Sequence, residues 1–197
     1  HLAGYQAIGI GPGLGQNASS SKALASLIPQ VQVPLVIDAD GLNLLAANPQ
    51  LLEKLPAQTI LSPHAGEFDR LFGKHNDWPS RLAKARQVAR NYPWVIVLKN
   101  TYTFVFHGND APFVNTQSTA GLAKAGTGDV LTGILLGLLA QGYAVAEAAK
   151  LAVYWHGYAG ILACETQSPV SLLAHEVTEH MRTALQKMSD YNRLRIA

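Results

Sequence analysis

Short apolar runs alternate with longer amphipathic segments along the chain, and the two kinds of segment predict different elements. Uninterrupted apolar runs between polar or glycine-rich turns are typical of buried strands, whereas apolar positions spaced three and four residues apart predict helices. The expected strands cover residues 5–10, 34–38, 59–62, 94–98, 103–107 and 112–115, with the last two joined as a hairpin at residues 108–110. The expected helices cover residues 20–28, 42–47, a helical turn ending at 72, then 80–91, 129–141, 145–166 and 172–188.

This order of elements indicates the α/β class. Apolar strands separated by helices predict a mostly parallel central sheet covered by helices on both faces. The 197 residues fit one domain, and the sequence shows no internal repeat, low-complexity tract or interdomain linker. Because the first residue is His1 rather than methionine, we expect the chain to begin inside a domain or to be a fragment of a longer polypeptide.

The composition is that of a globular protein, with 48% hydrophobic and 14% charged residues. The net charge is +2 and the 15 Lys and Arg residues are scattered, which argues against a nucleic-acid-binding face. The apolar run from Val130 to Ala140 is too short to cross a bilayer, so we expect no membrane contact. The single cysteine, Cys164, excludes an internal disulfide and suits a reducing compartment.

The stretch Ala-Gly-Thr-Gly-Asp-Val-Leu-Thr-Gly at residues 125–133 carries the strongest chemical signal. Gly126 and Gly128 let the backbone approach a ligand closely, and the helix that follows directs unpaired N–H groups and its positive dipole end into the turn. Such a turn binds anions, phosphate above all. An acid there repels phosphate unless it serves as a base or a metal partner, so Asp129 is the first catalytic candidate. The alternative is an Asp that only caps the helix.

Other polar and glycine-rich segments follow the predicted strands at their carboxyl ends, where ligands gather in open α/β sheets. These segments are residues 11–15, 38–43, 63–67 and 99–103. Each has a structural alternative: a tight turn at 11–15, a helix-capping pair at Asp38 and Asp40, a loop histidine at His64 and a solvated strand end at Lys99. Their shared position at one edge of the sheet favours a binding site.

Five motifs, in this order, resemble those of the ADP- or ATP-dependent NAD(P)H-hydrate dehydratases of the ribokinase-like superfamily. They are Gly-Pro-Gly-Leu-Gly (11–15), Asp-Ala-Asp-Gly-Leu-Asn (38–43), Ser-Pro-His-Ala-Gly-Glu-Phe (62–68), Val-Leu-Lys-Asn (97–100) and the stretch at 125–133. The resemblance covers nearly the whole chain. It implies repair of hydrated NADH and NADPH: a nucleotide phosphorylates the hydroxyl left by added water, and loss of phosphate regenerates the dinucleotide.

The resemblance also implies roles for individual residues. Asp129 would contact the substrate and take the proton from its hydroxyl, while backbone N–H groups of residues 126–128 neutralise the transferred phosphoryl group. Glu67 would hold a Mg²⁺ ion through water. The hydrated dinucleotide would contact Gly13, Gly15 and His64. The ADP or ATP would contact Lys99, Asn100, Thr101, Tyr102, Thr103, Gly126, Thr127 and Gly128.

The chain departs from related proteins at three places. Ala123-Lys124 stands where small-molecule kinases of the superfamily often carry Asp-Thr, which favours the dehydratase branch. Residues 173–177 stand where the family commonly has a small residue and an Asp, and we expect a helix start there. The family domain also has a preceding N-terminal portion with a glycine-rich segment that contributes to the substrate pocket. If the protein begins at His1, we expect an incomplete pocket that a partner chain completes.

Two other functions stay open. One is a small-molecule kinase of the same fold that phosphorylates a thiazole- or pyridoxine-type alcohol, and the other is a truncated, inactive nucleotide-binding module. The choice between ADP and ATP depends on the shape of a pocket that no motif here defines. The resemblance further implies a cytoplasmic protein that self-associates into a homo-oligomer.

Overall fold

The computed structural model describes residue 2 and residues 4–196, with side chains through residue 190. The expectation attached to His1 lies outside the described residues. Within this part of the chain, six strands form one sheet whose spatial order follows the sequence. The strands are β1 (Ile8–Ile10), β2 (Leu35–Ile37), β3 (Thr59–Leu61), β4 (Val95–Leu98), β5 (Thr103–His107) and β6 (Phe113–Asn115).

The helices occupy the segments between and after the strands. They are α1 (Ala18–Leu27), α2 (Ala39–Ala47), α3 (Ala65–Phe72), α4 (Trp78–Asn91), α5 (Thr127–Ala140), α6 (Val145–Thr166) and α7 (Ala174–Ile196). Short 3₁₀ turns η1 (Ile28–Gln30), η2 (Pro49–Lys54) and η3 (Ala120–Leu122) connect them. Every expected strand and helix is present. The last helix ends at Ile196, eight residues beyond the expected residue 188, and every other expected bound agrees within three residues. The 3₁₀ turns were not expected, because they are too short to show a hydrophobic period.

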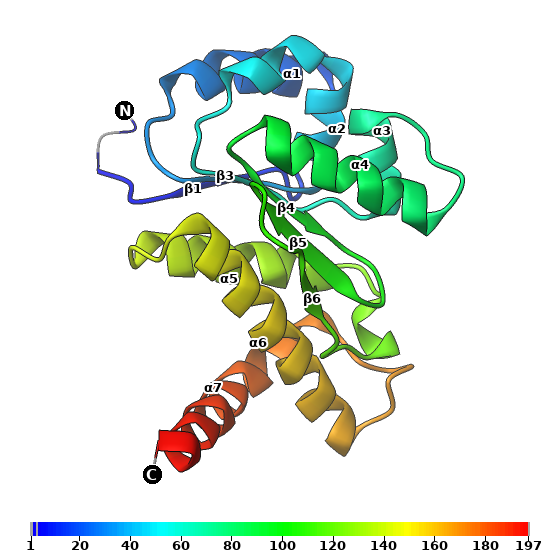
Figure 1. Ribbon diagram of the computed structural model, residues 1–197, viewed down its shortest axis with the longest axis vertical. Helices are drawn as coiled ribbons and strands as arrows, with labels where there is room; N and C mark the ends of the chain where they lie inside the picture. Colours follow the sequence, from blue (N-terminus) through cyan, green and yellow to red (C-terminus); the bar gives the residue numbers. More distant parts are fainter. Residues whose placement is uncertain (1, 3, 197) are drawn as a thin grey trace.

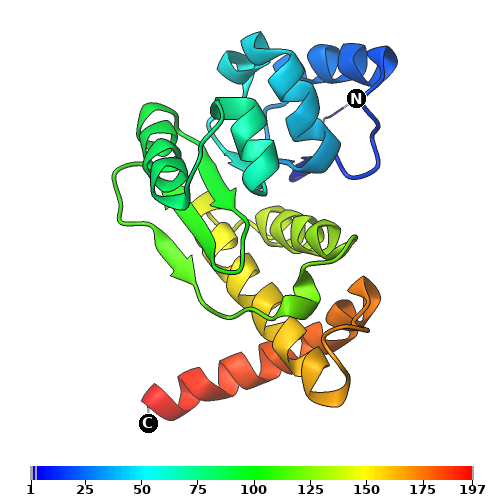
Figure 2. The same ribbon diagram turned by 90° about the vertical axis from the view of Figure 1, so that its right-hand side faces the viewer.

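Strands β1 to β4 pair in parallel, and β4, β5 and β6 pair antiparallel. The predicted mostly parallel sheet and the predicted hairpin are therefore both confirmed. Helices α1 to α4 cover one face of the sheet and helices α5 and α6 cover the other (Figure 1). A view from the side shows α1 and α7 at opposite ends of the molecule (Figure 2). None of the described helices combines the length and the apolar character needed to cross a membrane.

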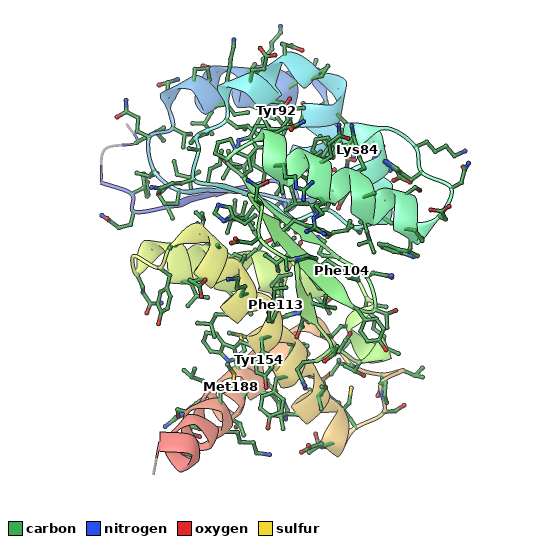
Figure 3. All side chains as sticks on the ribbon, viewed as in Figure 1. Lys84, Tyr92, Phe104, Phe113, Tyr154 and Met188 are labelled. Atoms are coloured by element: carbon green, nitrogen blue, oxygen red, sulfur yellow. The ribbon has the colours of Figure 1, made fainter. Side chains whose placement is uncertain are left out.

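The central strands β2, β3 and β4 are buried along their whole length, which explains their uninterrupted apolar sequences. Alternate residues of each strand enter opposite cores: Ile37 packs in the core beneath α1 to α4, and Val36 packs in the core beneath α5 and α6. Side chains fill both spaces, including Phe104 of the hairpin on one face (Figure 3). Each fully buried aliphatic side chain contributes roughly 1.5–3 kcal/mol to folding.

The fold gathers the strand ends and one helix N-terminus at a single edge. The loops after β1, β2, β3 and β4 lie side by side there because these strands are parallel and in register. Helix α5 packs over β1, where a methyl group built on Gly9 would lie 3.3 Å from Leu136. At the other end of the chain, Glu176 accepts the Leu173 N–H at 2.6 Å, so the expected helix start at 173–177 is confirmed.

Candidate active site

The N-terminus of α5 forms an open, rigid turn. Gly126 takes a left-handed conformation with φ of +87° as the N-cap, and the Thr127 hydroxyl donates to the carbonyls of Leu122 and Lys124 at 2.6 and 2.8 Å. The first full helical bond runs from the Val130 N–H to the Gly126 carbonyl at 3.1 Å, so the helix itself leaves the N–H groups of Gly128 and Asp129 unpaired. The capping alternative for Asp129 is wrong, since Gly126 is the N-cap and Asp129 is exposed in the first turn.

A buried ion pair lies directly beneath this turn. Lys99 Nζ donates to Asp38 Oδ1 at 2.6 Å, and the Thr132 hydroxyl of α5 donates to Asp38 Oδ2 at 2.8 Å. The side chains of Lys99 and Asp38 are 20% and 2% exposed, so the solvated alternative for Lys99 is wrong. Asp38 holds the N-cap position of α2 and Asp40 lies in its first turn, as the capping alternative expected, but the Asp38 side chain makes no capping bond and pairs with Lys99 instead. A methyl group on Gly128 would lie 3.6 Å from Lys99 Nζ, which places the ammonium group against the turn.

The turn at residues 11–15 is fixed by Asp40. Asp40 Oδ2 accepts the Gly15 N–H at 2.9 Å, and Asp40 Oδ1 accepts Gln16 Nε2 at 2.7 Å. These bonds, the one from Gln16 first, hold the pKa of Asp40 below its usual value. Gly13 is exposed with φ of +68° and has open space where a side chain would stand. Of the two glycines expected to bind substrate, Gly13 is therefore accessible, whereas the Gly15 N–H already has a partner.

His64 and Glu67 cap helix α3 reciprocally. His64 Nδ1 accepts the N–H groups of Gly66 and Glu67 at 3.0 and 3.3 Å, and Glu67 Oε2 accepts the His64 N–H at 2.8 Å. The His64 side chain is nevertheless 55% exposed, and its backbone pairs with Lys99 beyond the end of β3. The structure thus gives His64 a capping role and also brings it to the edge of the site.

The donors at this edge do not form a ready-made metal site. Among the residues that the structure describes, no group of three His, Cys, Asp or Glu side chains converges on one point. Glu67 is buried, with one carboxylate oxygen in the α3 cap. These residues fit a Mg²⁺ ion only if phosphate oxygens and water supply most of its ligands, which is the usual way that Mg²⁺ binds in nucleotide sites.

A pocket of about 100 Å³ extends from the turn toward β6 and α6. Of the nucleotide contacts expected from the sequence, Lys99, Asn100, Thr103, Thr127 and Gly128 line it. Thr101, Tyr102 and Gly126 are not part of its wall, and Tyr102 is exposed. The remaining lining residues are Asn115, Gln117, Ser118, Leu122, Leu131, Val153, His156 and Gly157.

His156 of α6 is the buried titratable group of this pocket. Its Nε2 atom has no hydrogen-bond partner within the described part of the chain. Burial lowers the pKa of His156 to about 4, and the nearby charge of Lys99 acts in the same direction, while a bond to the Thr127 backbone opposes them. The ring is therefore neutral at pH 7, with one nitrogen available to a ligand. Asn115 closes the pocket by donating to the Gln117 and Val153 carbonyls at 3.0 and 2.8 Å.

Sequence reasoning missed Thr132 and His156 and gave Asp38 only a capping role. Thr132 follows Gly128 by four residues, so the two share one face of α5, and this spacing could have marked Thr132 as facing the site. His156 lies on the apolar face of α6 between Ala152 and Gly160, both buried. A polar residue in such a face is a signal, but only the folded structure shows that it faces a pocket.

An open α/β sheet, a glycine turn with unpaired backbone N–H groups and an acid at the head of the following helix are typical of α/β proteins that bind a phosphorylated ligand at the sheet edge. The chain matches the family model described as NAD(P)H-hydrate dehydratase over residues 1–183 and belongs to that family.

Relatives of known name support this assignment. The chain is 35% identical over 191 residues to a bifunctional NAD(P)H-hydrate repair enzyme of Moorella thermoacetica, covering 96% of this chain and 36% of the relative. A Bacillus subtilis ADP/ATP-dependent NAD(P)H-hydrate dehydratase, crystallised with ATP and Mg²⁺, matches with a TM-score of 0.76 and 32% identity, covering 93% and 65%. A ribokinase-like protein of Enterococcus faecalis matches with a TM-score of 0.80 and 30% identity, covering 92% and 63%. The expected ribokinase-like fold is confirmed, although the chain spans only about a third of the curated relative and two thirds of the solved ones.

Proposed function

We propose that this chain carries the phosphoryl-transfer site of a nucleotide-dependent NAD(P)H-hydrate dehydratase. One observation supports the proposal above all others: exposed Asp129 stands in the first turn of α5, next to unpaired backbone N–H groups. The preceding residue, Gly128, lies near the Lys99 ammonium group, since a methyl group built on it would be 3.6 Å from Nζ. This arrangement provides a base and an electropositive cradle for a phosphoryl group at the same place.

The reaction would proceed in two steps. In the first, Asp129 accepts the proton of the substrate hydroxyl. At the same time the oxygen of that hydroxyl bonds to the terminal phosphorus of the nucleotide, and the bond from this phosphorus to the rest of the nucleotide breaks. The N–H groups of Gly128 and Asp129 and the Lys99 ammonium group neutralise the charge on the phosphoryl oxygens. In the second step, the carbon–oxygen bond of the phosphate ester breaks, a ring proton is lost, and the nicotinamide double bond is restored.

The pocket beyond the turn is the place for the nucleotide. It starts at Lys99 and Gly128, where the terminal phosphates would lie, and ends at the unpartnered His156 Nε2. The phosphates would bring Mg²⁺, with Glu67 acting through water as the resemblance implies. Such an ion would neutralise phosphate charge. The exposed Gly13 and His64 lie in the loops after β1 and β3, where the hydrated dinucleotide is expected to bind.

Three further features stay predictions from the resemblance. They are one ribokinase-like domain, a homo-oligomeric state and a cytoplasmic location. A small-molecule kinase is the second candidate, because transfer to an alcohol needs the same base and cradle. The two functions differ in the alcohol that is phosphorylated and in whether phosphate is then released from the product.

A turnover assay with hydrated NADH, Mg²⁺ and either ATP or ADP tests the proposal. We expect recovery of the near-ultraviolet absorbance of the reduced dinucleotide, with one phosphate released for each molecule repaired. A stable phosphate ester would instead establish the kinase, and nucleotide binding without turnover would establish an inactive module. The Asp129→Asn variant should bind nucleotide as before and lose turnover by about 10² to 10⁴, the usual value of a positioned base. Full turnover in that variant would remove Asp129 from the mechanism.

A further inference from the structure

The proposed mechanism leaves the most deeply buried carboxylate of the site without a task. Asp38 is 1% exposed and both of its oxygens have partners, Lys99 Nζ on one and the Thr132 hydroxyl on the other. Building on the proposed function, we infer that Asp38 and Thr132 are positioning residues that hold the Lys99 ammonium group against the phosphate-binding turn. They act through Lys99 and do not touch the substrate.

The ion pair spans an intervening strand. Asp38 follows β2 and Lys99 follows β4, with β3 between them, so the lysine must reach across roughly 10 Å of sheet at about 4.8 Å per strand. The residue directly after β3, Ser62, continues the register opposite Asp38. It is completely buried, and its small side chain leaves room for the lysine to cross. A lysine stretched in this way is held at both ends, by its strand and by Asp38.

Thr132 connects this pair to the helix that carries the turn. Its hydroxyl comes from α5, one helical turn after Gly128, and it satisfies the oxygen of Asp38 that Lys99 does not use. Asp38 therefore fixes the Lys99 ammonium group, which comes from the end of β4, relative to the N-terminus of α5. Gly128 lies beside both groups of the ion pair, since a methyl group there would stand in van der Waals contact with them, 3.6 Å from Nζ and 3.8 Å from Asp38 Oδ2.

The donor count shows how Lys99 can serve both partners. An ammonium group has three N–H donors, and Asp38 uses one. Lys99 lines the pocket, so its other donors can meet phosphate oxygens. If the Thr132 hydroxyl is removed, Asp38 Oδ2 is left buried without a hydrogen-bond partner, which is unfavourable. We expect the carboxylate to rotate so that both oxygens approach Lys99, which moves the ammonium group away from the phosphate-binding turn.

Binding of ATP and of adenosine, compared by calorimetry in wild type and Thr132→Val, tests the inference. Valine keeps the shape of threonine but removes the hydroxyl. We expect the affinity for ATP to fall about tenfold, the value of one hydrogen bond to a charged group, while the affinity for adenosine changes less than about twofold. Thr132→Ser should restore the affinity for ATP because it restores the hydroxyl. Thr178→Val on α7, where the hydroxyl bonds only to the Ala174 carbonyl, is the matched control and should bind both ligands normally.

Two results would overturn the inference: equal ATP affinity in Thr132→Val and wild type, or an equal loss for ATP and adenosine, which would indicate a general structural defect. Asp38→Asn provides a second measurement and should show the same phosphate-specific loss if it folds. These binding results do not depend on the reaction. If the wild type binds ATP in this manner yet fails to repair hydrated NADH, the proposed function falls and the positioning role stands.

Discussion

His156 is a buried side chain whose charge state bears on both stability and the pocket. The ring projects from α6 and bonds to the backbone of Thr127 in the turn at the start of α5. Its pKa is lowered to about 4, chiefly by burial. A neutral imidazole avoids placing a second positive charge near Lys99 at the point where phosphate should bind. The same burial means that the folded protein resists protonation of this ring more strongly than the unfolded chain does.

We therefore predict an acid-sensitive stability that depends on His156. The folded pKa of about 4 lies below the unfolded value of 6.5, so the unfolded state binds more protons between these values. Stability should be fully present above pH 6.5 and decline as the pH falls toward 4, by roughly 3 kcal/mol in total. Denaturant titrations of wild type and His156→Gln measure the free energy of unfolding between about pH 4 and 7.5, a range that contains the folded and unfolded pKa values of His156. The free energy of the variant should decline less steeply with falling pH.

A second acid-sensitive group serves as an internal reference. The bond from the Arg81 guanidinium lowers the pKa of Asp69 to about 2, so its contribution is lost as the pH falls from 3.8 toward 2. This window lies below that of His156, so the titrations of both proteins are extended down to about pH 2 to reach it, and the glutamine variant should leave it unchanged. Identical pH profiles for wild type and His156→Gln across the upper window would contradict the burial argument.

At the scale of single residues, the sequence predicted those whose chemistry is local. Asp129 could be predicted because a glycine turn, an acid and a helix start are neighbours in the chain. The Asp38–Lys99 pair could not, since its members stand far apart in sequence and meet only across β3. Thr132 and His156 carry no local motif that distinguishes a residue facing a ligand from one that packs in a core.

At the scale of elements, the turn after β1 depends on a side chain from the first turn of α2, Asp40. Gly11 packs so closely on the Asp38 carbonyl that a methyl group there would lie 1.7 Å from the oxygen, and Asp40 then holds Gly15 and Gln16. The Ser20 hydroxyl of α1 also donates to the Leu14 carbonyl at 2.9 Å. These contacts hold the turn in one conformation, with Gly13 exposed at its tip.

We predict that Asp40→Asn loosens this turn and affects one substrate more than the other. Asparagine keeps a single carbonyl oxygen, so it cannot accept both the Gly15 N–H and the Gln16 amide as the carboxylate does. The KM for hydrated NADH should rise about 5- to 30-fold, as expected for a lost charged hydrogen bond of about 1–2 kcal/mol, with little change in kcat or in the KM for ATP. Gln16→Ala removes only one contact and should have a smaller effect. An equal rise in both KM values would show that Asp40 acts on the whole site instead.

The element boundaries illustrate what periodicity can and cannot predict. Strands β2 to β4 were predictable because burial on both faces demands continuous apolar sequence, and the hairpin because Gly108-Asn109-Asp110 separates two apolar runs. Helix α2 begins at Ala39, earlier than expected, because Asp40 and Gly41 interrupt the apolar pattern while the backbone is already helical. Polar residues of the candidate site at the start of α2 thus hide the first residue of the helix from an analysis of hydrophobic periodicity.

At the scale of the whole molecule, the site lies where the two helical layers meet the sheet edge. The loops after β1, β2 and β3 lead into α1, α2 and α3 of one layer, and the loop after β4 leads into β5. The turn at 126–129 and His156 belong to the opposite layer (Figure 1). The class and the edge of the sheet were predictable from the alternation of elements. The contact between the layers was not, because it depends on how α5 packs over the sheet.

This arrangement leads to a prediction about Mg²⁺. Since the described residues contain no group of three metal-ligating side chains, Mg²⁺ alone has too few protein ligands to bind the folded state and should leave the melting temperature unchanged. ATP with Mg²⁺, bound as proposed, would contact the end of β4 and the α5 turn. It should stabilise the fold by about 2.7 kcal/mol at roughly 100 times its Kd, a shift of roughly 5–10 °C. Thermal melts with Mg²⁺, with ATP plus a chelator, and with both ligands separate these cases. Stabilisation by Mg²⁺ alone would reveal a protein-borne metal site and would contradict an ion delivered by the nucleotide phosphates.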